Sequence, residues 1–170
     1  GGMAAILGLE EALVKDICQQ CGTQIANINC PGQIVISGPI EALAQAIELA
    51  EAKGARRVVH LQVSGAFHSP LMQPAADGIS QAISKLAFHH PLNPIIANTT
   101  AQPITTAEAV KTELLHQLCH CVQWQRSIEY MVDAGVSTFI EIGPGQVLVG
   151  LVKRINKAVQ TLNTEVQSSK

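Results

Sequence analysis

Apolar and polar residues follow two alternating rhythms over the first third of the chain. Four short apolar or alternating runs have the length of strands: residues 3–9, 24–29, 33–38 and 57–63. Between them, residues 10–21 and 40–53 repeat apolar positions at helical spacing. The resulting order, β-α-β-β-α-β, is that of a ferredoxin-like unit. It predicts that residues 1–63 form a ferredoxin-like subdomain of one sheet and two helices.

The rhythm changes after residue 63, where helices and strands alternate as in a parallel α/β sheet. Helices are predicted over 69–86, 107–118, 122–134 and 146–155, and strands over 93–99 and 136–142. Two strands are too few to bury four amphipathic helices. We therefore expect residues 64–157 to be the C-terminal part of a larger α/β domain. Residues 158–170 lose their periodicity and are expected to form a frayed tail.

Composition narrows the class of protein. The 170 residues are 47% hydrophobic and 14% charged, with a net charge of −2, which offers no basic face for nucleic acid. No apolar run approaches the roughly 18 residues of a membrane span. Five cysteines without framework spacing, and no signal peptide, favour a reducing, cytoplasmic location. The first residues, "GGMAAILGL", already lie in an apolar run, so we expect the sequence to be a partial or processed chain.

The strongest candidate for chemistry is His68, in the stretch "SGAFHSPLM" between a strand and a helix. A lone histidine in such a loop is more often structural than catalytic. As a general base it would need a serine, cysteine or threonine to activate. The nucleophile motif G-x-S-x-G does not occur in the sequence, and neither Ser64 nor Ser69 lies in one. If His68 is a base, its nucleophile is expected upstream of residue 1.

Two further groups have both a chemical and a structural interpretation. Cys18 and Cys21, and a cluster of histidines and cysteines at 116–121, suggest zinc or redox chemistry. However, Cys18 and Cys21 continue the apolar stripe of a helix, which favours packing, and we expect no metal. Gly143-Pro144-Gly145 between a strand and a helix can cradle an anion or can simply form a tight turn.

Four stretches together resemble one family, malonyl-CoA:acyl-carrier-protein transacylase: "NINCPGQIVISG" (27–38), "VSGAFHSPLMQPAAD" (63–77), "VQWQRSIEYMVDAGV" (122–136) and "EIGPGQVLVGLVKRI" (141–155). Their order and spacing also match, and the resemblance covers nearly the whole chain. It implies an α/β-hydrolase-like acyltransferase domain with an inserted ferredoxin-like subdomain.

The resemblance also implies roles for four residues. His68 matches the family's catalytic histidine, and Gln117 matches the residue whose backbone carbonyl orients that histidine. Asn98, in "IIANTT", matches a polar position near the pocket. Phe67 resembles the variant associated with selection of malonyl over methylmalonyl groups, because its bulk would crowd a methyl branch.

The implied activity is transfer of a malonyl group from malonyl-CoA to the phosphopantetheine thiol of acyl carrier protein, in fatty acid biosynthesis, without a cofactor. The family's serine, its carboxylate-binding arginine and an upstream glutamine have no counterpart here, so this chain alone is expected to be inactive. Two alternatives stay open. One is an acyltransferase that serves a polyketide synthase, and the other is a non-catalytic module that binds carrier protein or CoA.

Overall fold

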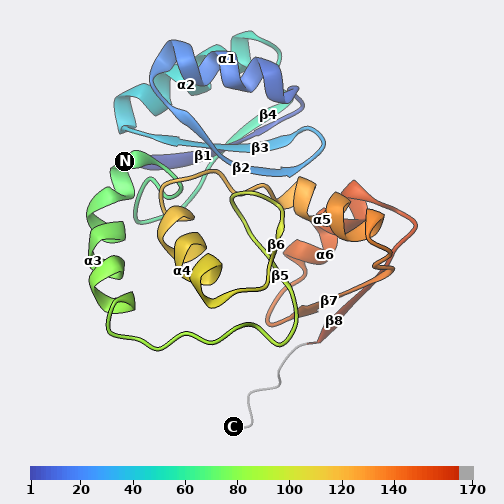
Figure 1. The fold of residues 1–170 in the computed structure, drawn as a ribbon. Helices are drawn as coiled ribbons and strands as arrows, with labels where there is room; N and C mark the ends of the chain where they lie inside the picture. The colour runs from blue at the N-terminus through green and yellow to red at the C-terminus, as the bar shows by residue number, and fades with distance from the viewer. Residues whose placement is uncertain (165–170) are drawn as a thin grey trace, which may run out of the picture.

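The computed structural model describes residues 1–164, and its first part is a sheet covered on one face by two helices (Figure 1). Its elements are β1 (Gly2–Leu7), α1 (Glu11–Cys21), β2 (Gln24–Cys30), β3 (Gln33–Gly38), α2 (Ile40–Ala52) and β4 (Arg57–His60). The predicted order of strands and helices is therefore present. The four strands are antiparallel, in the order β2-β3-β1-β4.

Side chains along β1 and β3 point alternately to the two faces of this sheet, both of which are buried, and the helices cover one face. Ile6 and Ile36 point to that face and are 1% and 0% exposed, packed with Ile17 of α1 and Leu43 of α2. Burying each of these side chains contributes roughly 1.5–3 kcal/mol. Cys18 belongs to the same core, which confirms its place on the apolar stripe of a helix.

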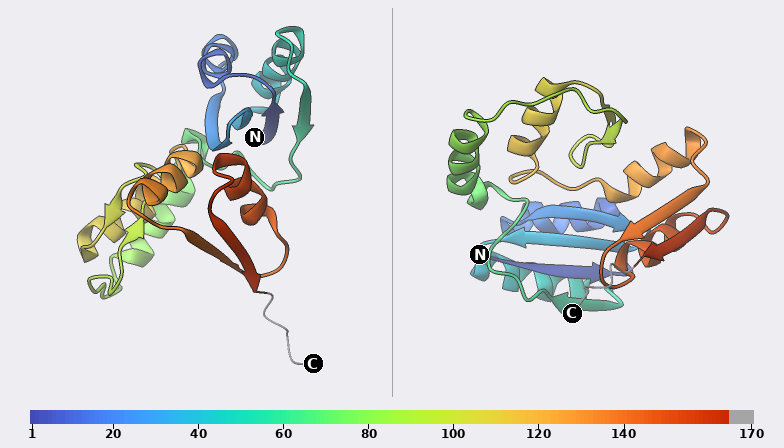
Figure 2. Two further views of the ribbon diagram at one scale, coloured as in Figure 1. Left: turned by 90° about the vertical axis from the view of Figure 1, so that its right-hand side faces the viewer. Right: turned by 90° about the horizontal axis from the view of Figure 1, so that it is seen from below.

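The second part lies against the opposite face and edge of the sheet (Figures 1 and 2). Its elements are the 3-10 turn Pro70–Met72, α3 (Gln73–Ile83), β5 (Ile95–Ile96), β6 (Pro103–Ile104), α4 (Ala107–His116), α5 (Trp124–Asp133), β7 (Thr138–Ile142), α6 (Val147–Ile155) and β8 (Gln160–Thr164). All four predicted helices are present, although the first begins as a 3-10 turn. No helix within residues 1–164 is long and apolar enough to cross a bilayer.

Two predictions for this part are wrong. The segment 158–170 was expected to fray, but Gln160–Thr164 forms β8, paired in parallel with β7 from Thr138 to Ile142. Backbone hydrogen bonds to β7 stabilise this strand although its sequence is largely polar. The rest of that tail, residues 165–170, lies outside the described residues. Strands β5 and β6 form an antiparallel hairpin where a single strand of a parallel sheet was expected.

The two parts are joined through β2, which is an edge strand of the four-stranded sheet. Ile28 donates a backbone hydrogen bond to the carbonyl of Val122 at 2.9 Å, and the Val122 N–H donates to the carbonyl of Ala26 at 2.8 Å. An ion pair between Arg126 of α5 and Glu11 of α1, at 2.8 Å, spans the same junction. The edge of β2 is therefore covered by the chain that leads into α5.

Candidate active site

The loop between β4 and the turn Pro70–Met72 places His68 in an unusual backbone conformation. His68 has a φ of +58°, in the left-handed region that non-glycine residues rarely adopt. Its N–H donates to the carbonyl of Leu118 at 3.0 Å. Such a conformation costs about 1–3 kcal/mol and persists only where neighbouring groups hold it, which is common at functional sites.

The imidazole ring of His68 is oriented by the chain that follows α4. Nδ1 of His68 lies 2.6 Å from the backbone carbonyl oxygen of Gln117. A carbonyl oxygen only accepts hydrogen bonds, so Nδ1 carries the hydrogen in the neutral ring. Nε2 then holds the lone pair, and it is the ring atom that can accept a proton. This is the tautomer that a histidine base needs.

The side chain of Gln117 is held in turn by Asn98. Asn98 donates from Nδ2 to Oε1 of Gln117 at 3.1 Å, and its carbonyl accepts from the N–H of Gln123 at 2.7 Å. The structure therefore brings together three of the four residues named from the sequence. Asn98 reaches His68 only through Gln117, so the geometry favours an orienting contact for this amide.

Phe67, the fourth of these residues, is partly buried against the core of the sheet. Its ring packs against the second face of the sheet, with Met3, Ala5, Ala26 and Val35. This contact is a structural reason for an apolar residue at this position. Its role in choosing the acyl group stays a prediction.

Ser69, next to the histidine, has a structural role. It is 1% exposed, donates from Oγ to the carbonyl of Ala66 at 2.6 Å and accepts from the N–H of Leu71 at 3.3 Å. The side chain therefore caps the turn Pro70–Met72 and closes the loop beneath His68. A buried hydroxyl bonded in this way is not presented to a substrate.

One contact to His68 was missed from the sequence. Nε2 of the Gln24 side chain donates to the carbonyl of His68 at 2.5 Å. Gln24 begins β2 and is 44 residues away along the chain, so no local motif links the two.

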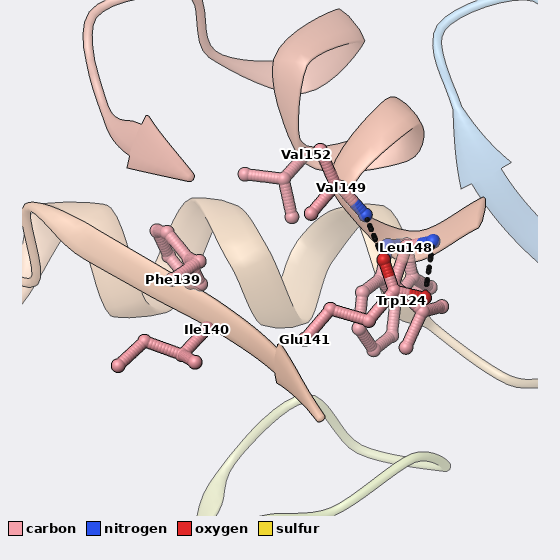
Figure 3. A pocket seen from close by; sticks show the side chains of 7 residues that line it. All are labelled: Trp124, Phe139, Ile140, Glu141, Leu148, Val149 and Val152. Atoms are coloured by element: carbon pink, nitrogen blue, oxygen red, sulfur yellow. Dashed lines mark hydrogen bonds between the residues drawn. The ribbon is translucent and has the colours of Figure 1, made fainter. Parts of the chain in front are cut away.

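A carboxylate of the chain itself caps the start of α6, after the Gly143–Gly145 turn. The carboxylate of Glu141, at the end of β7, accepts hydrogen bonds from the N–H groups of Leu148 at 3.1 Å and Val149 at 2.9 Å (Figure 3). This carboxylate occupies the positive end of α6. The adjoining apolar cavity, lined by Trp124 and Phe139, holds about 80 Å³, well below the ~300 Å³ of a typical ligand site.

All five cysteines are buried or half-buried. Within residues 1–164, no group of three or more histidine, cysteine, aspartate and glutamate side chains could hold a metal ion. All five thiols are free. Burial raises the pKa of the Cys18 thiol, and burial together with the charge of Glu11 raises the pKa of Cys121 to about 11, against the opposing effect of Arg126.

Cys121 should therefore react slowly with alkylating agents in the folded chain. The thiolate is the nucleophile, so a raised pKa lowers the reactive fraction at pH 8 and the rate should climb as the pH approaches 11. In the unfolded chain a cysteine thiol has a pKa of about 8.5. At pH 8 we therefore expect Cys121 to be alkylated on the order of 100-fold more slowly in the folded chain than in the unfolded one. Timed iodoacetamide labelling followed by peptide mass spectrometry, with and without guanidinium, measures this ratio. Equal rates in the two conditions would contradict it.

Comparison with known proteins matches the chain as a whole to acyltransferases. Residues 1–168 match the family model described as the acyl transferase domain. The malonyl CoA-acyl carrier protein transacylase of Bacillus subtilis is 42% identical over 167 residues, which are 95% of this chain and 53% of that protein.

Solved structures give the same picture. An acyl-carrier-protein-S-malonyltransferase from Bartonella henselae superposes with a TM-score of 0.93 at 42% identity, over 98% of this chain and 54% of that one. A malonyl-transacylase solved with its type II polyketide acyl-carrier protein gives 0.91 at 34% identity, over 99% of this chain and 55% of that one. The chain thus spans about half the length of the relatives it matches.

Proposed function

The chain belongs to the acyl transferase domain family, in line with the resemblance seen in its motifs, and we propose that it is the part of a malonyl-CoA:acyl-carrier-protein transacylase that supplies the histidine base. The observation that carries this proposal is the 2.6 Å contact between Nδ1 of His68 and the Gln117 carbonyl. Residues 1–63 are proposed as the ferredoxin-like subdomain, on the basis of their element order and the strand order β2-β3-β1-β4.

The proposed reaction has two half-reactions that share His68. Nε2 accepts the proton of a serine hydroxyl as its oxygen attacks the malonyl thioester, and then returns the proton to the departing CoA sulfur. In the second half-reaction, Nε2 takes the proton of the phosphopantetheine thiol as its sulfur attacks the serine ester. The proton then returns to the serine oxygen as it leaves. Gln117 keeps the ring in the required tautomer throughout.

The serine, and the groups that bind the malonyl carboxylate and the oxyanion, are assigned to sequence that this chain does not contain. A base without its nucleophile contributes little, so the 170-residue chain alone should not transfer malonyl groups. The partners proposed for the whole enzyme are malonyl-CoA and a phosphopantetheinylated acyl carrier protein, in the cytoplasm.

The test compares the chain alone with a combined protein, in which this chain is joined to the part of the Bacillus subtilis relative that it does not match. Both are incubated with malonyl-CoA and carrier protein, and the products are followed by intact-mass spectrometry. We expect malonyl-carrier protein only from the combined protein. Turnover by the chain alone, or a malonyl adduct on it, would refute its inactivity. A folded combined protein without transfer would refute the proposed function in favour of a binding module.

A polyketide pathway is the second candidate, supported by the match to the transacylase solved with a polyketide carrier protein. The same assay, run with a fatty acid carrier protein and with a polyketide carrier protein, distinguishes the two pathways by which carrier protein accepts the malonyl group faster.

A further inference from the structure

Both backbone polar groups of His68, its N–H and its carbonyl, make hydrogen bonds to other parts of the chain. On one side its N–H donates to Leu118, in the segment that follows α4. On the other side its carbonyl accepts from Nε2 of Gln24, at 2.5 Å. Because φ is +58° at this residue, release of either contact would let the loop relax toward a commoner conformation. Such a change would move the ring away from Gln117.

Gln24 is well placed to hold this carbonyl. It is the first residue of β2, and its register partner is Ser37 of β3, so its backbone is fixed by the sheet. Its side chain is half-buried and reaches from the first part of the molecule to the loop of the second. Its primary amide can donate to a carbonyl, which neither a carboxylate nor a thioether of similar size can do.

We propose that Gln24 is a positioning residue for the His68 base. By fixing the His68 carbonyl, it keeps Nδ1 against Gln117 and leaves the lone pair on Nε2. This inference rests on the proposed function for its effect on rate, but its effect on the ring can be observed without turnover. A displacement of about 1 Å at a reacting group can cost on the order of 100-fold in rate.

The experiment uses Gln24→Met and Gln24→Glu in the combined protein defined above. Both substitutions keep the length of the side chain and remove its donor at neutral pH. The matched control is Gln45→Met, on the exposed face of α2. In histidine-selective ¹⁵N NMR, the unchanged protein and Gln45→Met should show a single Nδ1–H tautomer for His68. The two Gln24 variants should show a mixture of tautomers.

The kinetic readout separates positioning from substrate binding. We expect kcat to fall about 10- to 100-fold in both Gln24 variants, with KM for malonyl-CoA within about twofold. A folded variant with an unchanged His68 tautomer and unchanged kcat would overturn the inference. It is also overturned if neither variant folds, since a positioning contact should leave the sheet intact. If the unchanged combined protein is folded but inactive, the proposed function fails, and the NMR comparison alone decides the role of Gln24.

Discussion

Replacing His68 with alanine in the combined protein should lower the rate of malonyl transfer about 10²- to 10⁴-fold. The imidazole is proposed to carry the proton in both half-reactions, and Nε2 is available for this because Nδ1 is engaged by the Gln117 carbonyl. Loss of the ring should therefore slow formation of the serine ester as well as its transfer to carrier protein. Rapid-quench measurement of both steps tests the prediction.

His120→Ala is the matched control for this substitution. His120 also places Nδ1 against a backbone carbonyl, that of His116, at 2.7 Å, but its side chain is exposed at the surface. A hydrogen bond from an imidazole ring to a backbone carbonyl is not sufficient for a role in malonyl transfer, so this variant should keep full activity. If His68→Ala retained more than a tenth of the rate, another group would have to serve as the base.

A second prediction concerns self-association through the apolar face of β7 and β8, which is formed by Ile140, Ile142 and Leu162. These side chains are 56%, 76% and 53% exposed, and Ile140 and Leu162 are register partners. Parallel sheets are normally covered on both faces, and a two-stranded sheet is marginal by itself. We therefore expect the 170-residue chain to self-associate in solution through this face.

Replacing Ile140 and Ile142 together with threonine should relieve this self-association. Threonine retains the preference for strands but removes apolar surface. The double variant should shift toward monomer in light scattering and bind the dye ANS several-fold less. Ile40→Thr is the matched control, since Ile40 is also 56% exposed but lies at the start of α2, outside the sheet of β7 and β8. If the chain without substitutions were monomeric and unfolded in a sharp, reversible thermal transition, the prediction would be contradicted.

Much of the fold was predictable because helices buried along one stripe repeat apolar residues at helical spacing, and strands buried within the sheet read as short apolar runs. β1 and β3 send alternate residues to the helices, and α1 repeats Val14, Ile17 and Cys18 toward the same core. β8 escaped prediction because its residues are mostly polar and its one large apolar side chain, Leu162, faces outward. Its pairing depends on β7, about 20 residues earlier in the chain, and no local pattern encodes this.

The hairpin of β5 and β6 was missed for a different reason. Each strand has two residues, too few to show a period, and the turn between them uses Ala101 at a φ of +56°, where glycine would be the usual signal.

At the candidate site, too, some features were predictable from the sequence and others were not. The loop at His68 and the start of the following helix were predicted from the residues themselves. The role of His68 as a base was implied by the family resemblance of the surrounding motifs. The Gln117 contact was implied only by that resemblance, and the Gln24 contact was not anticipated. Both partners are more than 40 residues away, and each acts through one hydrogen bond, which leaves no periodic trace in the sequence.

The backbone bonds between β2 and Val122 bear on where this molecule can be divided. The boundary near residue 63 separates two patterns in the sequence, but the amides of Ile28 and Val122 are bonded across it. Opening either part should expose both amides together, so their hydrogen exchange is expected to report one shared unfolding event. A piece cut at residue 63 would leave β2 with a bare edge. We therefore expect the two parts to unfold as one cooperative unit, and residues 1–63 not to behave as an independent module.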